Sequence, residues 1–303
     1  MTNSILKRLL TSRVFAVVIA LFFISCEKPI DFVPNESTPE LVVEATIEAG
    51  EYPRVLLSNS FSFFSEISID MLVNSFVRGA EITISNGAKT HRLKEYEVPL
   101  SGTYKLYYYS VDSSDIATLF KGEQGKSYTM KVKVSGKEYN ARTTIPFLTK
   151  KIESLSWETV KKKDDTSKVI LYGQTTDPPG LGNYIRYFTS TNGGPFFPGL
   201  NSVFDDKIVD GESYKVQIEK GVNRNEKIDF EEYSFFERGD AIVVKMTNID
   251  RATYDFWRTI EYSYSSIGNP FSSPTKVLTN VDGGALGYFG GYSVQYASIK
   301  IPK

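Results

Sequence analysis

Cysteine is almost absent from this 303-residue sequence, which contains only Cys26. A single thiol cannot form a disulfide within the chain, so no such bond staples the fold. Exported proteins meet an oxidising compartment, where paired cysteines are useful and an odd free thiol is a liability. The one thiol therefore calls for a use of its own, and its place in the sequence indicates what that use is.

Histidine is equally scarce, with His91 alone. One histidine and one cysteine cannot assemble a zinc or blue-copper ligand set. A Ser-His-Asp or Cys-His catalytic arrangement would have to rest on His91, which follows the Asn86-Gly87 turn signal and is expected to be an exposed hairpin residue. The sequence has no Gly-x-Ser-x-Gly elbow and no phosphate-binding loop. These absences predict a protein that is not an enzyme, with no catalytic, metal-binding or cofactor-binding residues.

Two weaker signals for ligand sites have simpler interpretations. Gly180-Leu181-Gly182 lacks the third glycine of a dinucleotide loop and predicts a turn. The acidic pairs are expected in solvated loops; a calcium site in such a loop stays open, although no Asp-x-Asp-x-Asp-Gly spacing is present. A glycosidase pair of carboxylates stays open at this level, since sequence gives no separation between them. The acidic pairs are Asp164-Asp165, Asp205-Asp206 and Glu231-Glu232.

An excess of basic charge is also missing, since the chain has 35 basic and 36 acidic residues. Removing the first 25 residues takes away three basic residues and leaves 32 against 36, a net charge of −4. The one basic run, Lys161-Lys162-Lys163, leads directly into an acidic pair and predicts a charged hairpin tip. Nucleic-acid binding usually leaves a clustered basic footprint, so it is excluded.

Long apolar runs are lacking too. The longest uncharged apolar run, Val14 to Ile24, has eleven residues, far fewer than the roughly 20 that span a bilayer. The basic residues before it are Lys7, Arg8 and Arg13. A basic region followed by a short apolar run predicts an export signal over residues 1–25.

The end of this signal predicts lipid attachment at Cys26. An ordinary cleavage site needs small residues at its third and first positions, and Phe23 is large. Lipoprotein processing accepts a bulky apolar residue there and a small one, Ser25, next to the cysteine. A buried structural thiol is rejected because nothing folded precedes it. Two or more acyl chains anchor a protein stably, so Cys26 is predicted to be the membrane tether.

The mature chain predicts a mainly β fold. Residues 26–39 are rich in proline and predict an extended linker. Residues 40–146 carry about seven short strand patterns and predict an immunoglobulin-like β-sandwich. Its clearest hairpin turns at Ser135-Gly136. Residues 147–303 predict a second β-rich domain.

One helix is expected in this second domain, over residues 251–266. Asp250 is positioned to cap it, and Gly268 followed by Asn269-Pro270 is expected to stop it. Its aromatic face is expected to pack on a sheet. The residues at helical spacing are Thr253, Phe256, Trp257, Ile260 and Tyr264.

Two aromatic groups suit ligand or protein contact as well as packing. Tyr107-Tyr108-Tyr109 lies in a strand, so successive rings point to opposite faces and at least one is expected outside. Phe196-Phe197 lies in a stretch rich in glycine and proline that predicts a loop. Cross-strand packing is the simpler interpretation of both groups.

Taken in order, a series of short motifs resembles the DUF4249 family of Bacteroidetes outer-membrane lipoproteins, over nearly the whole mature chain. Ala45 and Ile185 depart from the family's usual Gly and Tyr. The motifs are Ser25-Cys26-Glu27-Lys28, Ile30-Asp31, Leu41-Val42-Val43-Glu44, Val55-Leu56-Leu57-Ser58, Gly79-Ala80-Glu81-Ile82-Thr83-Ile84, Asp177-Pro178, Asn183-Tyr184-Ile185-Arg186-Tyr187, Tyr254-Asp255-Phe256-Trp257 and Leu286-Gly287-Tyr288-Phe289.

The resemblance implies a protein held by its lipid in the outer membrane, either at the cell surface or on the periplasmic face. It also implies a possible partner, a TonB-dependent outer-membrane receptor, and a non-catalytic binding or accessory role in nutrient uptake. The alternative is an adhesion or envelope-structural lipoprotein that makes protein contacts. The family has no established functional residues to carry over, so the ligand is left open.

Overall fold

The computed structural model describes residues 38–61, 67–100, 102–160, 166–267, 269, 271–273 and 275–303. By its internal contacts the chain divides into Met1–Thr38 and a compact unit, Pro39–Lys303. The predicted signal (1–25), Cys26 and nearly all of the predicted linker (26–39) lie outside the described residues.

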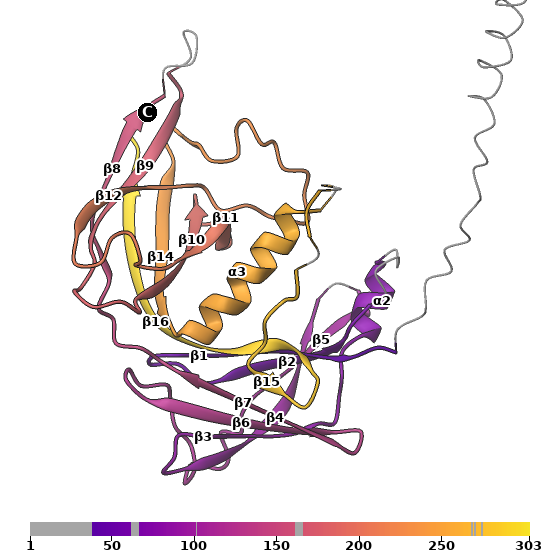
Figure 1. Cartoon of the computed structure of the whole chain (residues 1–303). Helices are drawn as coiled ribbons and strands as arrows, with labels where there is room; N and C mark the ends of the chain where they lie inside the picture. The colour runs from indigo at the N-terminus through magenta and orange to yellow at the C-terminus, as the bar shows by residue number, and fades with distance from the viewer. Residues whose placement is uncertain are drawn as a thin grey trace, which may run out of the picture. The chain divides into compact units, whose positions relative to one another are not determined.

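The described chain is mainly β, as predicted, with two helices among its described residues (Figure 1). Alternating buried and exposed residues mark most strands, because successive side chains point to opposite faces of a sheet. The strands are β1 Leu41–Glu48, β2 Arg54–Asn59, β3 Glu81–Ser85, β4 Thr90–Pro99, β5 Lys105–Val111, β6 Ser127–Val134, β7 Lys137–Thr144, β8 Lys151–Thr159, β9 Lys168–Thr176, β10 Tyr184–Thr191, β11 Phe197–Phe204, β12 Ser213–Ile218, β13 Phe236–Glu237, β14 Ala241–Ile249, β15 Val281–Asp282 and β16 Leu286–Lys300. The helices are α2 Ile69–Asn74 and α3 Arg251–Ser265.

The last strand, β16, connects the two halves of the fold. Its first half pairs in parallel with β1, where Glu44 lies opposite Tyr288 and Glu48 opposite Tyr292. Its second half pairs antiparallel with β14, up to Lys300 opposite Ala241. A single path of hydrogen-bonded strands therefore runs β11-β10-β14-β16-β1-β2-β5 and on through β4 to β3, β6, β7 and β15.

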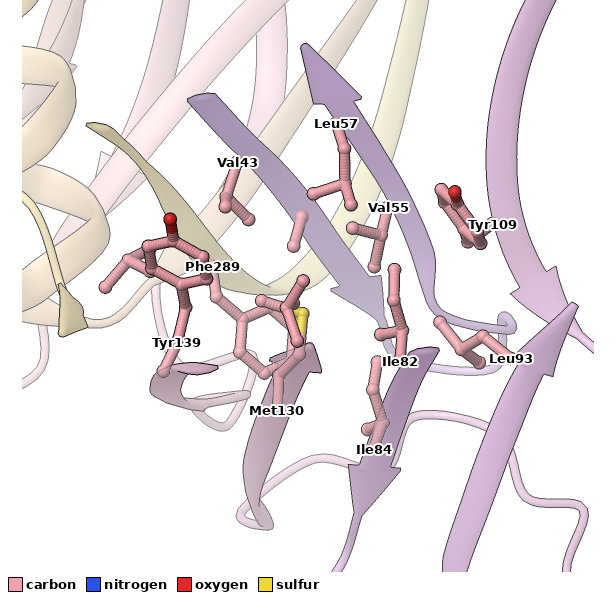
Figure 2. Close-up of a cluster of buried hydrophobic side chains, with 14 of the residues drawn as sticks. Val43, Val55, Leu57, Ile82, Ile84, Leu93, Tyr109, Met130, Tyr139 and Phe289 are labelled. Atoms are coloured by element: carbon pink, nitrogen blue, oxygen red, sulfur yellow. The ribbon is translucent and has the colours of Figure 1, made fainter. Parts of the chain in front are cut away.

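The first half has two layers that share one core (Figure 2). β1, β2 and β5 contribute residues such as Val43 and Leu57, and the β3-β6-β7 layer contributes residues such as Ile82 and Met130. β4 joins the layers, because its first three residues pair with β3 and the rest pair with β5. Phe289, from β16 near the C-terminus, is fully buried in this core.

The second half packs a smaller sheet of β8, β9, β12 and β13 onto one face of β10, β14 and β16. Val169 and Leu171 of β9 face Val244 and Met246 of β14 in this second core. Residues before Pro146 belong to the first core, and most residues after it belong to the second core. Strand β16 contributes to both cores, and Pro39–Lys303 forms one compact unit. The expected division into domains 40–146 and 147–303 stays a prediction.

Helix α3 covers the opposite face of the same sheet, and its prediction is confirmed within one residue. The Asp250 carboxylate caps it by accepting from the Thr253 backbone N–H at 2.9 Å. The same carboxylate accepts from Thr143 Oγ1 at 2.9 Å and from the Thr144 N–H at 3.0 Å, so it also holds the end of β7. Phe256 is buried and stacks on Tyr288 of β16 with ring centroids 4.5 Å apart.

Several elements differ from the sequence-based expectations. The stretch expected as a loop around Pro198-Gly199 forms β11, which pairs with β10 through an irregular register. The hairpin indicated by Asn86-Gly87 is present, because β3 pairs antiparallel with β4 across it. A short helix, α2, occurs where none was expected and is capped by the Ser68 side chain.

Candidate binding site

A polar pocket of about 430 Å³ lies on the face of the large sheet that α3 partly covers. Strand alternation puts its residues there, because cross-strand partners share a face. Glu44 lies opposite Tyr288, Glu48 opposite Tyr292, and Phe188 opposite Lys245. Neighbouring residues such as Ile185 and Val43 point to the other face, into the cores. The same strands therefore build a core on one side and a pocket on the other.

Arg186 is the central cation of the pocket and is only 4% exposed. Its guanidinium carbon lies 3.4 Å from the centroid of the Trp257 ring and 4.7 Å from that of Phe188. Its Nε donates to Ser202 Oγ at 3.1 Å. A buried arginine stacked on tryptophan is held by cation–π attraction, which strengthens when water is excluded. The pocket therefore has a fixed positive charge with an aromatic wall.

Helix α3 is fixed to this wall through a buried carboxylate, Glu261. It accepts from the Ser202 backbone N–H at 3.0 Å and also from the Ser202 hydroxyl. Ser202 in turn accepts from Arg186, so the helix, β11 and β10 meet in one polar chain. Buried polar groups with satisfied hydrogen bonds give an arrangement with little freedom to relax. This hydrogen-bond network holds Trp257 of α3 against the Arg186 side chain.

Two tyrosines of β16 complete the buried part of the pocket. Tyr288 and Tyr292 have their hydroxyl oxygens 3.1 Å apart, and Trp257 Nε1 donates to Tyr292 at 3.4 Å. Burial raises the pKa of both tyrosines. Arg186 partly opposes the rise at Tyr292. Gly290 lies between them, and a Cβ there would be 2.8 Å from the Tyr288 ring and 2.9 Å from the Tyr292 ring. The residue must be small for the rings to close over it.

Glu44 is a carboxylate that lines the pocket. Its side chain is exposed, yet desolvation by the surrounding protein raises its pKa, although Arg186 and Arg54 lower it. Its neighbour Glu48 is different, because it is paired with Lys245 at 2.7 Å. A carboxylate that keeps solvent contact while its surroundings raise its pKa is typical of a functional site.

Arg224 also lines the pocket. Its NH2 group donates to the Leu200 carbonyl at 2.9 Å and lies 3.8 Å from Glu261. Its Nε is buried and has no hydrogen-bond partner among the described residues. The pocket thus combines a solvent-accessible carboxylate, an arginine with an unused donor, and aromatic rings. Such a set can hold a small polar ligand by charge, hydrogen bonds and stacking.

The family model for a domain of unknown function, DUF4249, matches residues 27–297. The chain belongs to the DUF4249 family. No curated protein matches the sequence. The match over residues 27–297 confirms the predicted family.

The pocket gathers four of the motifs through which the chain resembles DUF4249 proteins. Glu44 ends the first strand's motif, Arg186 lies in the motif of β10, Trp257 ends the motif of α3, and Tyr288 lies in that of β16. These residues are far apart in the sequence, but all four line one pocket. Spaced catalytic motifs do not reveal a DUF4249 pocket built this way, whereas the family motifs contain these four of its residues.

The predicted site residue, Cys26, lies outside the described residues, and its lipidation stays a prediction. Within the described ranges, no helix has both the length and the apolar character that crossing a bilayer requires.

The expectation that His91 is an exposed hairpin residue is wrong, because it is 1% exposed. Its Nδ1 lies 2.7 Å from Thr118 Oγ1, and its Nε2 accepts from the Asp112 N–H at 2.9 Å. Both partners come from the loop after β5, so β4 turns this ring inward and the loop covers it. His91 is therefore a satisfied structural residue.

The acidic pairs have different outcomes. Asp164-Asp165 and the basic run before it lie outside the described residues. Asp206 is buried, not solvated, and accepts from the backbone N–H groups of Gly182 and Asn183 at 2.7 and 2.8 Å. Burial works against ionisation of Asp206, but these N–H groups lower its pKa. The predicted turn at Gly180-Leu181-Gly182 is confirmed, and its backbone holds this carboxylate.

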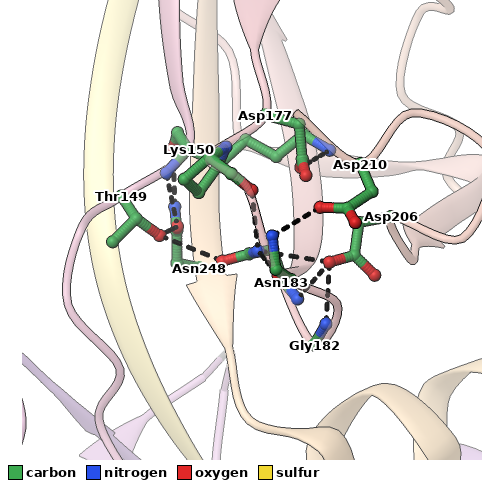
Figure 3. A network of polar contacts seen from close by, with 10 residues as sticks. Thr149, Lys150, Asp177, Gly182, Asn183, Asp206, Asp210 and Asn248 are labelled. Carbon is green, nitrogen blue, oxygen red and sulfur yellow. Dashed lines mark hydrogen bonds and ion pairs between the residues drawn. The ribbon is translucent and has the colours of Figure 1, made fainter. Parts of the chain in front are cut away.

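Asp206 belongs to a carboxylate cluster with Asp177 and Asp210, whose nearest oxygens lie within 4.8 Å of one another (Figure 3). These are the described residues most suited by type to hold a cation. Lys150 already provides one, because its Nζ lies 2.7 Å from Asp177 Oδ1 and both side chains are buried. Asp210 accepts from the Gly180 N–H at 2.6 Å. The cluster works as an internal clamp on two loops.

The aromatic groups are used mainly for packing, as the simpler interpretation held. Tyr109 is buried in the first core, while Tyr108 stacks on Tyr96 with centroids 5.5 Å apart. Phe196 packs against Tyr296. Phe197 lines the polar pocket, so it is the one member of these groups that lies at the candidate site.

Proposed function

We propose that this DUF4249 protein is a lipid-anchored, non-catalytic binding module of the outer membrane that serves TonB-dependent nutrient uptake. The observation that supports it is the convergence of Glu44, Arg186, Trp257 and Tyr288 from four separate motifs on one pocket. The pocket volume of about 430 Å³ is within the range of small-molecule sites. A tether at Cys26 would keep this pocket close to the membrane where uptake occurs.

The pocket chemistry favours a small zwitterion, such as an amino acid or a short peptide. Glu44 offers a carboxylate to a ligand ammonium, and Arg224 has an unused Nε donor for a ligand carboxylate. The rings of Trp257 and Phe197 supply the apolar contact. An ion pair with the buried Arg224 donor is screened less by salt than a pair on an open surface.

The transport role is tested by deleting the gene and measuring uptake of labelled peptides. We expect reduced uptake, restored by the wild-type gene and not by a Cys26→Ser variant. The wild-type protein should also co-purify with a TonB-dependent receptor from detergent-solubilised outer membranes.

Two results would contradict the proposal. One is uptake that is unchanged on deletion, with no receptor in the purified material. The other is a deletion strain that loses surface attachment while uptake stays normal, which would favour the adhesion alternative.

A further inference from the structure

A second cavity, of about 460 Å³, lies on the opposite face of the strands that build the polar pocket. It is enclosed between β10 and β14 on one side and β9 and β12 on the other. Ile185 and Tyr187 line this cavity, whereas Arg186 and Phe188 between and beside them line the polar pocket. The two sites therefore share a strand but have no common lining residue on β10.

The cavity wall is predominantly apolar, with aliphatic and aromatic side chains. Its members come from both sheets and include Ile152, Ile185, Val203, Ile218, Val244 and Met246. The charged residues at its edge are already paired: Lys215 lies 2.6 Å from Glu158, and Asp205 lies 3.1 Å from Lys207. A wall of this kind favours an apolar, uncharged guest.

One polar atom in this wall has no protein partner. Thr175 continues the inward row of β9 after Leu171 and Gly173, and it is 3% exposed. Its Oγ1 makes no hydrogen bond to any residue that the structure describes. Leaving a buried hydroxyl unsatisfied costs stability, so such an atom calls for a partner. Because Thr175 lines the cavity, a guest inside it can provide that partner.

The rim of the cavity is apolar and is carried by a clamped loop. Ile208 is 94% exposed and Phe204 is 42% exposed, and both line the cavity. Asp206 and Asp210 fix the loop that carries Ile208 by accepting backbone N–H groups of the 180–183 turn (Figure 3). An exposed isoleucine held at a cavity mouth gives an alkyl chain an apolar surface to cross.

We propose that this cavity binds a small neutral amphiphile, an alkyl chain that ends in an alcohol or ester oxygen bonded to Thr175. The apolar walls take the chain, and the Thr175 hydroxyl takes the oxygen. Paired charges at the edge make a neutral head the better match. This site is separate from the peptide pocket of the proposed function, so either can fail alone.

The test uses the full chain carrying Cys26→Ser, purified without detergent, and displacement of the fluorescent probe 1-anilinonaphthalene-8-sulfonate. 1-Decanol and methyl decanoate are the neutral amphiphiles, and decane is the chain without a head. We expect the two amphiphiles to displace the probe more strongly than decane. Thr175→Val should weaken the binding of 1-decanol by roughly 3- to 10-fold, which is the value of one hydrogen bond. It should leave the binding of decane unchanged.

Matched controls separate the site from general effects. Thr176→Val makes the same chemical change one residue along β9, on the outer face, and should leave 1-decanol binding unchanged. Val244→Phe should block the cavity, whereas Val243→Phe, on the other face of β14, should not. The proposal is overturned if 1-decanol displaces no probe, if Val244→Phe and Val243→Phe behave alike, or if Thr175→Val has no larger effect than Thr176→Val.

Discussion

Replacing Asp177 by asparagine leaves Lys150 as a buried charge without its counter-ion. The stability of this variant gives the most quantitative test of the buried ion pair. Asp177 and Lys150 are at most 1% exposed, with Nζ and Oδ1 2.7 Å apart. The Lys150 backbone is fixed as well, since Asn248 bonds both its N–H, at 3.0 Å, and its carbonyl, at 2.8 Å. The ammonium therefore cannot easily swing into solvent when its partner loses its charge.

Breaking such a pair on one side typically costs about 3–5 kcal/mol. The upper limit follows from the alternative open to the lysine, which is to lose its proton. Neutralising a lysine of ordinary pKa, about 10.4, costs about 4.6 kcal/mol at pH 7 and about 2 kcal/mol at pH 9. We therefore expect Asp177→Asn to lower the free energy of unfolding by about 3–5 kcal/mol at pH 7 and by about 2 kcal/mol at pH 9.

The wild-type protein should behave differently with pH. Burial works to lower the pKa of Lys150, but hydrogen bonds with Asp177 and Tyr214 raise it on balance. A raised pKa of a lysine gives stability that is complete below the unfolded value, near 10.4, and lost as pH rises through the folded value. The titration of Lys150 therefore adds no pH dependence to the stability of the wild-type protein between pH 7 and pH 9. In the variant, stability should rise over that interval.

The assay is urea unfolding followed by circular dichroism at pH 7 and pH 9. Asp210→Asn is the matched control at an exposed carboxylate of the same cluster, with an expected cost below about 1 kcal/mol. Adding Lys150→Met to Asp177→Asn should recover most of the loss, because no unpaired charge remains. A cost below about 1 kcal/mol for Asp177→Asn, or a cost equal at both pH values, would refute the reasoning.

Three further predictions concern the polar pocket and the first core. Glu44→Gln should raise the melting temperature at pH 7 and change it little near pH 4: the raised pKa of Glu44 favours the protonated form in the folded state, so its penalty appears as pH rises, and thermal unfolding at the two pH values measures it. Gly290→Ala should cost about 1–3 kcal/mol in urea unfolding by forcing apart the Tyr288 and Tyr292 rings; an unchanged midpoint would show that the rings have room to move. Phe289→Ala should cost about 3–5 kcal/mol because the ring is fully buried, whereas Phe271→Ala, at a ring 95% exposed, should stay within about 0.5 kcal/mol; equal midpoints would contradict the shared core.

Local patterns predicted the elements whose residues decide their own structure. The alternation of Tyr128, Met130 and Val132 with lysines fixes β6, and Asp250 with the aromatic spacing fixes α3. β11 was missed because Pro198 and Gly199 are poor strand formers, and pairing with β10 overrides that preference.

Long-range contacts decide the remainder. His91 is buried by a loop 21 to 27 residues further along the chain, so no local pattern could place it. Nothing in the local sequence distinguishes Arg186 from other polar residues in strands. Only the packing of helix α3 on the sheet brings it beside Trp257. The pocket could be approached from the sequence through the family motifs, but its charge and shape required the register of β1, β10 and β16.

Native mass spectrometry tests the central claim, that the Arg186 pocket is the ligand site, most directly. The full chain with Cys26→Ser is incubated with a casein hydrolysate, which supplies amino acids and short peptides. Thr46→Phe should fill the polar pocket, and Val244→Phe fills the apolar cavity instead. We predict a retained amino acid or peptide mass on the unblocked protein and on Val244→Phe, and none on Thr46→Phe. Equal retention by Thr46→Phe, or no retained mass on the unblocked protein, would contradict the account.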